Sequence, residues 1–561
     1  MGQNLFDNLD GIAVREDGGP LWSARATFKP SSEFDLMLVP RVPDWRESDE
    51  AREGLEQIEA EPWAGSISER GDQVRLHLRD DWIEAAAAAL EAGESANADI
   101  ADGQRYAVYF WGANTTKALH IGHLRNLALG NAIGASLRQA GARVEHRSLI
   151  CDVGRSMGEA MAGVVSSGRE QQLGSDGEEK SDHFVGACYS SYVTASRANG
   201  AAAEDTAEDS VARESALYND KADELMMRVL GGNQQALELW SKTRASVISG
   251  QRKTLSRLGI PFDKVIFESD FLPEVQELTN QGLSEGTLTR RYTDDMVMYE
   301  TRREELEEMP LVRADGLPTQ HMRALAYWSA APELDDVISL QVCGTEWVSH
   351  VTCRRQLIDA LGAVNGNGHG SAKGGGPPTY DVFHGMVARE RQAITSSKEG
   401  ALLIDDLAEW IEAEVEADPE RAAVARAHPH PERIPAQVAL GYFLLQPTTK
   451  RVEFEPEKLL LEDNTSLGWD LARAQARRGG RATLAGSRPA EDPEFRFAVI
   501  QSEMYRRHLQ SAVGDFDPEP LARYLSHLAR WYGEAERAPE VERLVQAVLD
   551  KGIRGLGMEP A

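Results

Sequence analysis

Between Ala107 and Ile150 the hydrophobic and polar positions predict a strand, a turn, a helix and a second strand. Val108–Trp111 is an apolar run typical of a buried strand. Gly112 interrupts it, and from Leu119 to Leu137 apolar residues recur at helical spacing. Gly141 lies where a glycine commonly follows a helix C-terminus. This unit is the best-defined part of the sequence, and the rest of the chain can be interpreted around it.

The turn before this helix carries Lys117, His120 and His123, with Gly122 between the histidines. A helix N-terminus attracts anions because its first amides are unpaired and its dipole is positive at that end. Two imidazoles and an ammonium group added there suit a polyphosphate whose charge grows during a reaction. The missing side chain at Gly122 would let a flat base lie against the backbone.

His120–His123, His-Ile-Gly-His, resembles the HIGH signature of class I aminoacyl-tRNA synthetases, and Ala113–Asn126 resembles its arginyl-tRNA synthetase version. A four-residue motif alone is weak, and its alternative is a loop with two solvated histidines. The strand–turn–helix context and the flanking Asn114 and Lys117 favour the synthetase interpretation. The resemblance implies an enzyme that activates an amino acid with ATP.

A chain of 561 residues is too long for one hydrophobic core, so we expect several domains. The expected fold class is α/β, with a Rossmann-like catalytic domain, an N-terminal α/β appendage and a C-terminal helical bundle. By resemblance the parts are an N-terminal additional domain (1–103), a catalytic domain (104–405) with a helical insertion over about 160–310, a helical stem (406–480) and an anticodon-binding-like domain (481–561).

In the N-terminal part, Glu33–Val39 and Gln73–Leu78 have the pattern of strands, and Asp81–Ala92 that of an Ala-rich helix. Glu94–Gly103 is small and polar, as linkers are. The family's additional domain contacts the tRNA elbow, and a solvated appendage remains the alternative.

The middle of the chain predicts further alternation of helix and strand. Gly168–Asp209 is polar and acidic, which indicates a surface insertion, and Ala212–Leu258 predicts a pair of long helices. Gly259–Phe267 and Val337–Gly344 predict strands, the second followed by a helix over His350–Leu361. This order is similar to that of the arginyl family.

The next segment holds a second signature in degenerate form. Ala363–Pro378 is Gly-rich and is interpreted as a linker, and Asp381–Val387 predicts a strand. Ile394–Gly400 lies where class I enzymes carry the KMSKS loop, but only Lys398 of its lysines is present. The family resemblance implies that Lys117 substitutes for the missing one. A Ser/Thr turn with a solvated lysine is the alternative.

The C-terminal part is mainly helical, with helical apolar spacing over Arg496–Leu509, Leu521–Tyr532 and Glu542–Leu549. It resembles the anticodon-binding bundle of arginyl enzymes. Its basic residues form either an RNA face or a solvated helix face; they are Arg506, Arg507, Arg523 and Arg530.

The net charge of −30 repels a phosphate backbone at long range, which weakens the expectation of a tRNA partner without removing it. The four cysteines are scattered without metal-binding spacing, which indicates reduced, inert thiols and no metal site. No apolar run suits a bilayer span, and the first residues lack a signal-peptide pattern. We therefore expect a cytoplasmic protein, a monomer, without membrane contact.

Activation by class I enzymes joins an amino-acid carboxylate to the α-phosphate of ATP and releases pyrophosphate, so the protein must supply positioned donors. The resemblance implies that His120, His123, Lys117 and Lys398 stabilise the phosphate charge. Mg²⁺ is expected to bridge the phosphates without a dedicated protein cage. The other ATP-binding residues implied are Gly122, Thr115, His384, Gly385, Met386, Val387, Ser396 and Ser397. The implied amino-acid pocket consists of Asn114, Tyr109, Asp152, Gln320, Ala324, Glu346 and Trp347.

The amino-acid half of the site departs from the arginyl pattern. The family's carboxylate five residues before the Asn is Tyr109 here, and its Tyr and Asp on a later helix align with Gln320 and Ala324. A family Gln aligns with Trp347. Losing the partner of a buried charge costs about 3–5 kcal/mol, roughly a hundredfold to several-thousandfold in binding. Glu346 could replace one carboxylate from another direction.

Three functions follow from these observations. The first is an arginyl-tRNA-synthetase-like paralogue that adenylates an amino acid other than arginine and passes it to tRNA or to a small amine. The second is a divergent but genuine arginine–tRNA ligase. The third is a non-catalytic binding or regulatory protein with a retained synthetase fold, against which the presence of His120, His123 and Lys117 counts.

Overall fold

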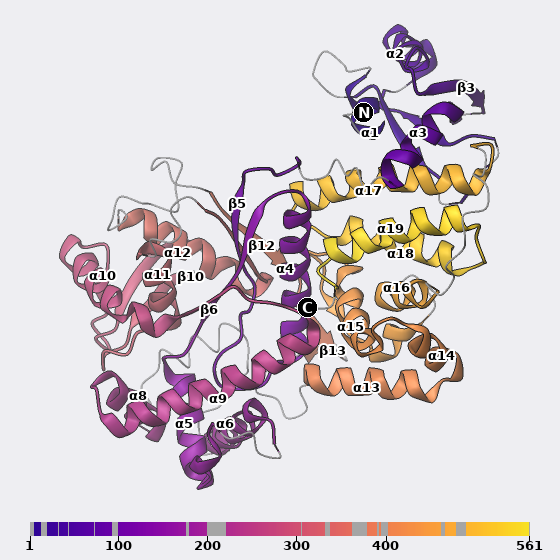
Figure 1. The fold of residues 1–561 in the computed structure, drawn as a ribbon. Coiled ribbons are helices and arrows are strands. Elements are labelled where there is room, and N and C mark those ends of the chain that lie inside the picture. The colour runs from indigo at the N-terminus through magenta and orange to yellow at the C-terminus, as the bar shows by residue number, and fades with distance from the viewer. Residues whose placement is uncertain are drawn as a thin grey trace.

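The fold was analysed in a computed structural model (Figure 1). It describes residues 5–12, 20–27, 29–31, 33–42, 44–71, 73–91, 99–174, 179–198, 220–303, 306–330, 337–361, 378–389, 392–393, 402–461, 466–477 and 490–559.

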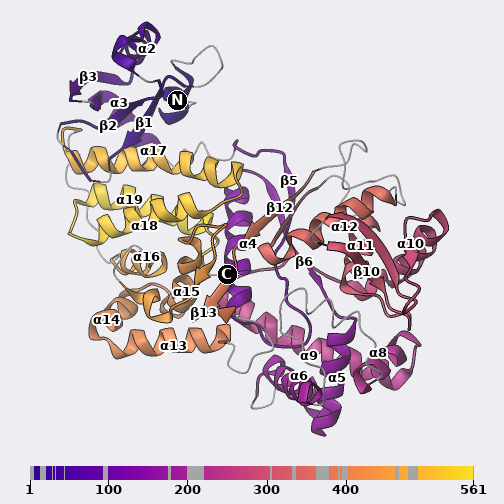
Figure 2. The same cartoon turned by 180° about the vertical axis from the view of Figure 1, so that it is seen from behind.

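The N-terminal part is an antiparallel sheet with helices beside it. The sheet order is β1-β2-β4-β3, and short apolar strands with one buried face build it. In Figures 1 and 2 this part lies against α17. The elements are α1 (Leu5–Gly11), β1 (Trp22–Ala26), β2 (Leu36–Pro40), α2 (Asp49–Glu59), β3 (Ala64–Arg70), β4 (Gln73–Leu78) and α3 (Asp80–Glu91).

A five-stranded parallel sheet forms the centre of the molecule, in the order β12-β11-β5-β6-β7. In chain order this is the doubly wound arrangement, whose direction reverses between β5 and β11. The Rossmann-like prediction is confirmed. The strands are β5 (Arg105–Tyr109), β6 (Arg143–Ile150), β7 (Lys264–Phe267), β11 (Ile338–Gly344) and β12 (Thr379–His384).

Helix α4 (Ile121–Gln139) packs on one face of this sheet, between the sheet and the C-terminal helices (Figure 1). Its glycines allow the close approach: a Cβ on Gly130 would lie 2.1 Å from Phe110 Cγ, and one on Gly134 would lie 2.1 Å from His146 Nε2. The opposite face is covered by α11 (Gln320–Ala330) and α12 (Val348–Ala360).

The insertion after β6 is helical, and its beginning differs from the prediction. Residues expected to be a polar surface segment include α6 (Ser181–Ala198), which packs between α5 (Arg155–Ser167) and α9. Its apolar residues, Phe184 and Val185 among them, lie in a small core of their own. The acidic composition concealed this buried stripe. The remaining elements are α8 (Lys221–Leu230), α9 (Gln234–Leu258), α10 (Leu272–Glu285), β8 (Thr289–Arg290), β9 (Val297–Arg303) and β10 (Leu306–Val312).

The C-terminal third is a stack of helices beside α4, preceded by a small sheet in the order β14-β13-β15. Arg125 of α4 joins the two parts, because its buried guanidinium donates to the carbonyls of Gly385, Lys450, Pro447 and Thr448 at 2.7–3.0 Å. The elements are β13 (Val387–Arg389), β14 (Gln392–Ala393), α13 (Ile404–Ala417), α14 (Pro419–Ala427), α15 (Ile434–Leu444), β15 (Val452–Glu453), α16 (Leu467–Ala476), α17 (Pro493–Gly514), α18 (Glu519–Gly533) and α19 (Pro539–Gly555).

Most predicted elements are confirmed with bounds shifted by a few residues. Gly141 does follow the end of α4, with φ of 99°. The glycine-rich segment 363–377 and the degenerate signature 394–400 lie outside the described residues. In the part of the chain that the structure describes, no helix is long and apolar enough to cross a membrane.

Candidate active site

The turn that carries the two histidines follows β5, at the carboxyl edge of the sheet. Strand β11 is the neighbour of β5, so this turn and Gly344–Trp347 meet where the strand order reverses. Open α/β sheets bind ligands at this point, because the loops on either side of it diverge and leave a crevice. The topology therefore places the candidate site here independently of any motif.

His120 is the N-cap of α4, and both motif histidines are oriented by backbone amides. The Gly122 N–H donates to His120 Nδ1 at 3.1 Å, and the His120 N–H donates to His123 Nδ1 at 3.2 Å. Because each Nδ1 accepts a hydrogen bond, each neutral ring carries its proton on Nε2. The ring centroids are 3.8 Å apart, and the ring planes are tilted by 30°.

These imidazoles are neutral at physiological pH. Burial, the neighbouring His123 and Lys117 hold the pKa of His120 well below its usual value. Burial and Lys117 lower the pKa of His123 to about 3. The site therefore offers two neutral N–H donors together with the ammonium group of Lys117, which lies 5.3 Å from the ring centre of Tyr189.

Hydrogen bonds to α9 and to the end of β6 fix the loop before the motif. Gln251 of α9 donates through Nε2 to the carbonyls of Asn114 and Lys117, at 3.1 and 2.8 Å. The Thr115 hydroxyl is fully buried and donates to the Cys151 carbonyl at 2.9 Å. The buried Thr115 side chain fastens this loop to the end of β6, and its expected contact with ATP stays a prediction.

The turn after β12 has less free backbone than expected. The Gly385 N–H donates to the Thr448 carbonyl, and the Gly385 carbonyl accepts from Arg125. The His384 ring lies 3.0 Å from both the Gly385 carbonyl and Asn126 Oδ1. The Met386 carbonyl likewise accepts from the Val452 N–H at 2.9 Å.

Tyr109 lies at the end of β5, on the face of the sheet opposite α4. Its hydroxyl is 2.6 Å from that of Tyr327 and accepts a hydrogen bond from Arg147 at 3.2 Å. The Trp328 ring lies 5.0 Å away. Arg147 is 3% exposed and also pairs with Glu145 at 2.8 Å. An aromatic, cationic cluster thus occupies the position where the arginyl pattern has a carboxylate.

Asp152 was predicted to line the amino-acid pocket, and in the structure its carboxylate is bonded within the chain. The side chain is fully buried and accepts hydrogen bonds from the Ser269 amide, the Ser269 hydroxyl and Arg244, at 2.7–2.9 Å. These donors come from segments more than 90 residues away in sequence, so the sequence did not indicate them. Asp152 holds β6, α9 and the β7 end together.

The remaining pocket residues gather on α11 and at the end of β11. Gln320 begins α11 and Ala324 lies one turn later, and both are half-buried. Glu346 is exposed just after β11, and Trp347 is half-buried with its ring 5.6 Å from that of His350. Among the described residues, no ion pair to the Glu346 carboxylate is found.

Three expected ATP-binding residues, Lys398, Ser396 and Ser397, lie outside the described residues. Within the described part of the chain, no group of three His, Cys, Asp or Glu residues could hold a metal ion.

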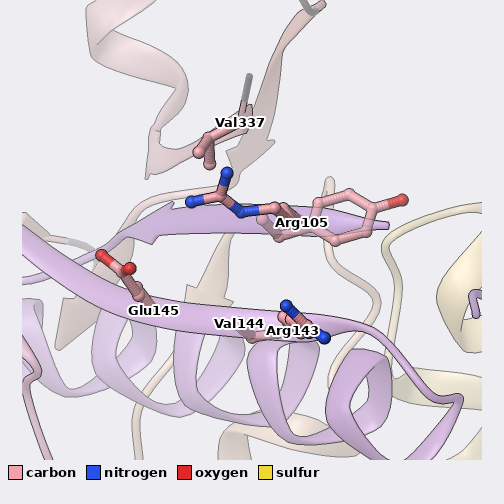
Figure 3. Close-up of a pocket in the computed structure, with 6 residues that line it drawn as sticks. Arg105, Arg143, Val144, Glu145 and Val337 are labelled. Atoms are coloured by element: carbon pink, nitrogen blue, oxygen red, sulfur yellow. The ribbon is translucent and has the colours of Figure 1, made fainter. Parts of the chain in front are cut away.

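A cavity of about 220 Å³ lies at the opposite, amino-terminal edge of the central sheet. Figure 3 shows Arg105 on β5 and Arg143 and Glu145 on β6 around it, near Val337. These charged side chains are exposed, and this edge carries the amino ends of the strands, whereas the candidate site lies at their carboxyl ends. We therefore do not assign the cavity to the active site.

The four C-terminal arginines considered for an RNA face are engaged within the chain. Arg506 pairs with Asp99, Arg523 with Glu519 and Arg530 with the buried Asp470, while Arg507 donates to the Ala24 carbonyl. Neither alternative drawn from the sequence describes them fully, because these contacts join helices and domains. The partners are distant in sequence, apart from Glu519 one helical turn away.

Sequence reasoning missed Gln251, Arg147 and Arg125, which contact the site or its supporting loops. Gln251 lies on the buried side of a long helix whose pattern showed only an apolar stripe. Arg125 is the second residue after the motif, and its proximity was the single available signal. Arg147 is the neighbour of Tyr109 in the next strand, a relation fixed by sheet register.

No family model matches the chain. An arginine–tRNA ligase of Amoebophilus asiaticus is 28% identical over 462 residues, covering 76% of this chain and 73% of that protein. One of Treponema denticola is 27% identical over 457 residues, covering 78% and 72%. The arginyl-tRNA synthetase structure of Thermus thermophilus superposes with a TM-score of 0.67 at 19% identity over 99% of both chains. That of Plasmodium falciparum gives 0.64 at 15% identity, covering 100% of this chain and 99% of that one.

The doubly wound sheet, the His-Ile-Gly-His segment at its strand-order reversal and the C-terminal helical stack together define a class I aminoacyl-tRNA synthetase fold. The sequence relatives make the assignment narrower. The chain is an arginyl-tRNA synthetase-like protein, a ligase of the synthetase class.

Proposed function

We propose that the protein is an arginine–tRNA ligase, which activates arginine with ATP and transfers it to tRNA. The similarity to arginine–tRNA ligases over about three quarters of both chains carries this proposal, together with the oriented histidine pair. We expect it to act as a monomer in the cytoplasm.

In this reaction the arginine carboxylate attacks the α-phosphorus of ATP, and pyrophosphate leaves. Negative charge grows on the phosphoryl oxygens and on the leaving group, so fixed donors that are already desolvated lower the barrier. The Nε2–H groups of His120 and His123 supply two such donors, and Lys117 supplies a positive charge. Mg²⁺ would enter with ATP, bound mainly by phosphate oxygens and water.

A second candidate is activation of a different amino acid, and the Tyr109 position favours it. A guanidinium substrate needs a carboxylate partner, whereas Tyr109 is bound to Tyr327 and to the cation of Arg147. Under the arginine proposal, Glu346 is the group that would meet the substrate guanidinium. Its role therefore separates the two candidates.

The test is ATP–pyrophosphate exchange with each amino acid in turn, with and without total tRNA. The family resemblance implies that arginine activation needs tRNA, so exchange with arginine in the presence of tRNA is expected. Glu346→Gln should then raise the KM for arginine by about two- to fivefold, since an exposed ion pair contributes up to about 1 kcal/mol. Thermal unfolding of the variant checks that it folds.

Other results lead to other conclusions. Exchange with another amino acid, unaffected by Glu346→Gln, would establish the second candidate and overturn the first. Silence with every amino acid while ATP still binds would instead indicate a non-catalytic protein that keeps the synthetase fold.

A further inference from the structure

Helix α9 touches the candidate site through two polar side chains on one buried face. Gln251 and Thr254 lie one helical turn apart and are 0% and 1% exposed. Gln251 holds the carbonyls of Asn114 and Lys117, which precede the histidine motif. Thr254 donates its hydroxyl to the carboxylate of Asp405 at 3.0 Å. Helix α9 thus contacts the loop before the motif through Gln251 and contacts Asp405 through Thr254.

Asp405 is the most heavily bonded carboxylate near the site. Besides Thr254 it accepts from Lys180 Nζ at 2.7 Å and lies 3.1 Å from His183 Nε2. Lys180 in turn contacts Asp182 and Thr254. Asp405 is 8% exposed. These side chains come from α6 and the residue before it, from α9 and from α13, so the carboxylate joins the helical insertion to the first helix of the C-terminal stack.

The residues just before Asp405 run beside the motif. The Ile121 N–H donates to the Leu402 carbonyl at 3.1 Å, and the Ile404 N–H donates to the Leu119 carbonyl at 3.0 Å. His120 and Leu403 form an antiparallel bridge between these bonds. The backbone of His120 is therefore fixed by a short strand segment that Asp405 holds in place.

We propose that Gln251 and Asp405 are positioning residues for the synthetase reaction, and that they fix Lys117 and His120 from opposite sides through α9. The inference rests on the proposed function, because it assumes that Lys117 and His120 stabilise the phosphate charge of the activation step. Neither positioning residue needs to touch ATP. They act by keeping the donors where the charge develops.

Such residues affect the rate more than substrate binding. Interactions that strengthen in the transition state determine kcat, and a displacement of about 1 Å can cost roughly a hundredfold. In ATP–pyrophosphate exchange we expect Gln251→Met to lower kcat about a hundredfold and to change the KM for ATP by less than about threefold. Methionine keeps the side-chain volume but cannot donate to the two carbonyls.

Asp405 provides a graded comparison. Asp405→Asn retains an acceptor for Lys180 and Thr254 and should keep a larger share of kcat than Asp405→Ala. The matched control is Thr243→Val, which removes another buried hydroxyl of α9, one that bonds only to the Leu239 carbonyl of its own helix in the contacts found. It should leave kcat within about twofold of wild type.

Hydrogen–deuterium exchange gives a readout that does not depend on turnover. Amides of 114–123 should exchange faster in Gln251→Met than in wild type or Thr243→Val, while the core strands remain protected. A wild-type kcat together with wild-type hydrogen–deuterium exchange in Gln251→Met and Asp405→Ala would overturn the inference and leave the proposed function intact. A wild-type chain that is inactive with every amino acid would overturn the proposed function. In that case, unchanged hydrogen–deuterium exchange of amides 114–123 in the variants would separately overturn the positioning contacts.

Discussion

Arg496 on α17 and Asp35 next to β2 form a buried, two-bond ion pair across 461 residues of sequence, with N–O distances of 2.6 and 2.8 Å. The guanidinium also bonds to Asp80 and to the carbonyls of Leu78 and Ala490. This one side chain fastens the N-terminal sheet to the C-terminal helices.

Removing that guanidinium should be costly, because it leaves a buried carboxylate without its partner. We expect Arg496→Met to lower the free energy of unfolding by about 3–5 kcal/mol, measured by urea denaturation. Arg506→Met is the control: its partner Asp99 is exposed, so the loss should stay below about 1 kcal/mol. Equal losses in the two variants would contradict the assigned role of Arg496.

Two substitutions should distinguish the roles of the two ring nitrogens of His123. Asparagine can imitate the Nδ1 acceptor but lacks the Nε2 donor, whereas the amide of glutamine reaches the Nε2 position. Loss of one transition-state donor costs roughly a hundredfold to a thousandfold in rate. The pyrophosphate-exchange rate of His123→Asn should therefore be lower than that of the wild type by this factor. His123→Gln should retain more activity. The reverse order would show that the Nδ1 acceptor matters more than the Nε2 donor.

Acid should destabilise the fold through its buried histidines. Burial lowers the pKa of His123, His146 and His321 to about 3, and that of His384 and His508 to about 4. The unfolded chain binds these protons near pH 6.5, so stability is fully present above that pH and is lost as pH falls toward 4. His183, whose pKa is raised by its bond to Asp405, acts in the opposite direction.

The free energy of unfolding between pH 7 and 5, from urea titrations, checks this prediction. Each proton bound only by the unfolded chain contributes a slope of about 1.4 kcal/mol per pH unit. His146→Leu should reduce the slope. A stability independent of pH in this range would show that the histidines protonate within the fold.

Arg530 should matter for stability more than for RNA. It donates to Asp470, which is 1% exposed and also accepts from the Ser526 hydroxyl. Arg530→Gln should lower the free energy of unfolding by about 1–3 kcal/mol and leave the KM for tRNA within about twofold. Arg426→Gln is the control, because it removes the same charge at an exposed position. A tenfold rise in that KM at unchanged stability would restore the RNA-face interpretation.

The sequence predicted features that depend on neighbouring residues. The strand, the capped helix and Gly141 around the motif follow from apolar spacing and from backbone preferences within about 40 residues. What it missed depends on distant partners: the pattern does not show that Ser269 and Arg244 saturate Asp152, or that Arg147 lies beside Tyr109. The α6 core was missed because the acidic residues before and after it dominate the composition of 168–209.

Helix α4 has a mechanical consequence beyond packing. Its first turn carries the motif, and further along it Asn131, Ser136 and Gln139 donate to the carbonyls of Gly557, Gly555 and Lys551 near the chain terminus. Nineteen residues of helix form a rod roughly 28 Å long. A molecule that shifts the terminal helices against the sheet would therefore rotate α4 as a rigid body and displace His120 at its other end.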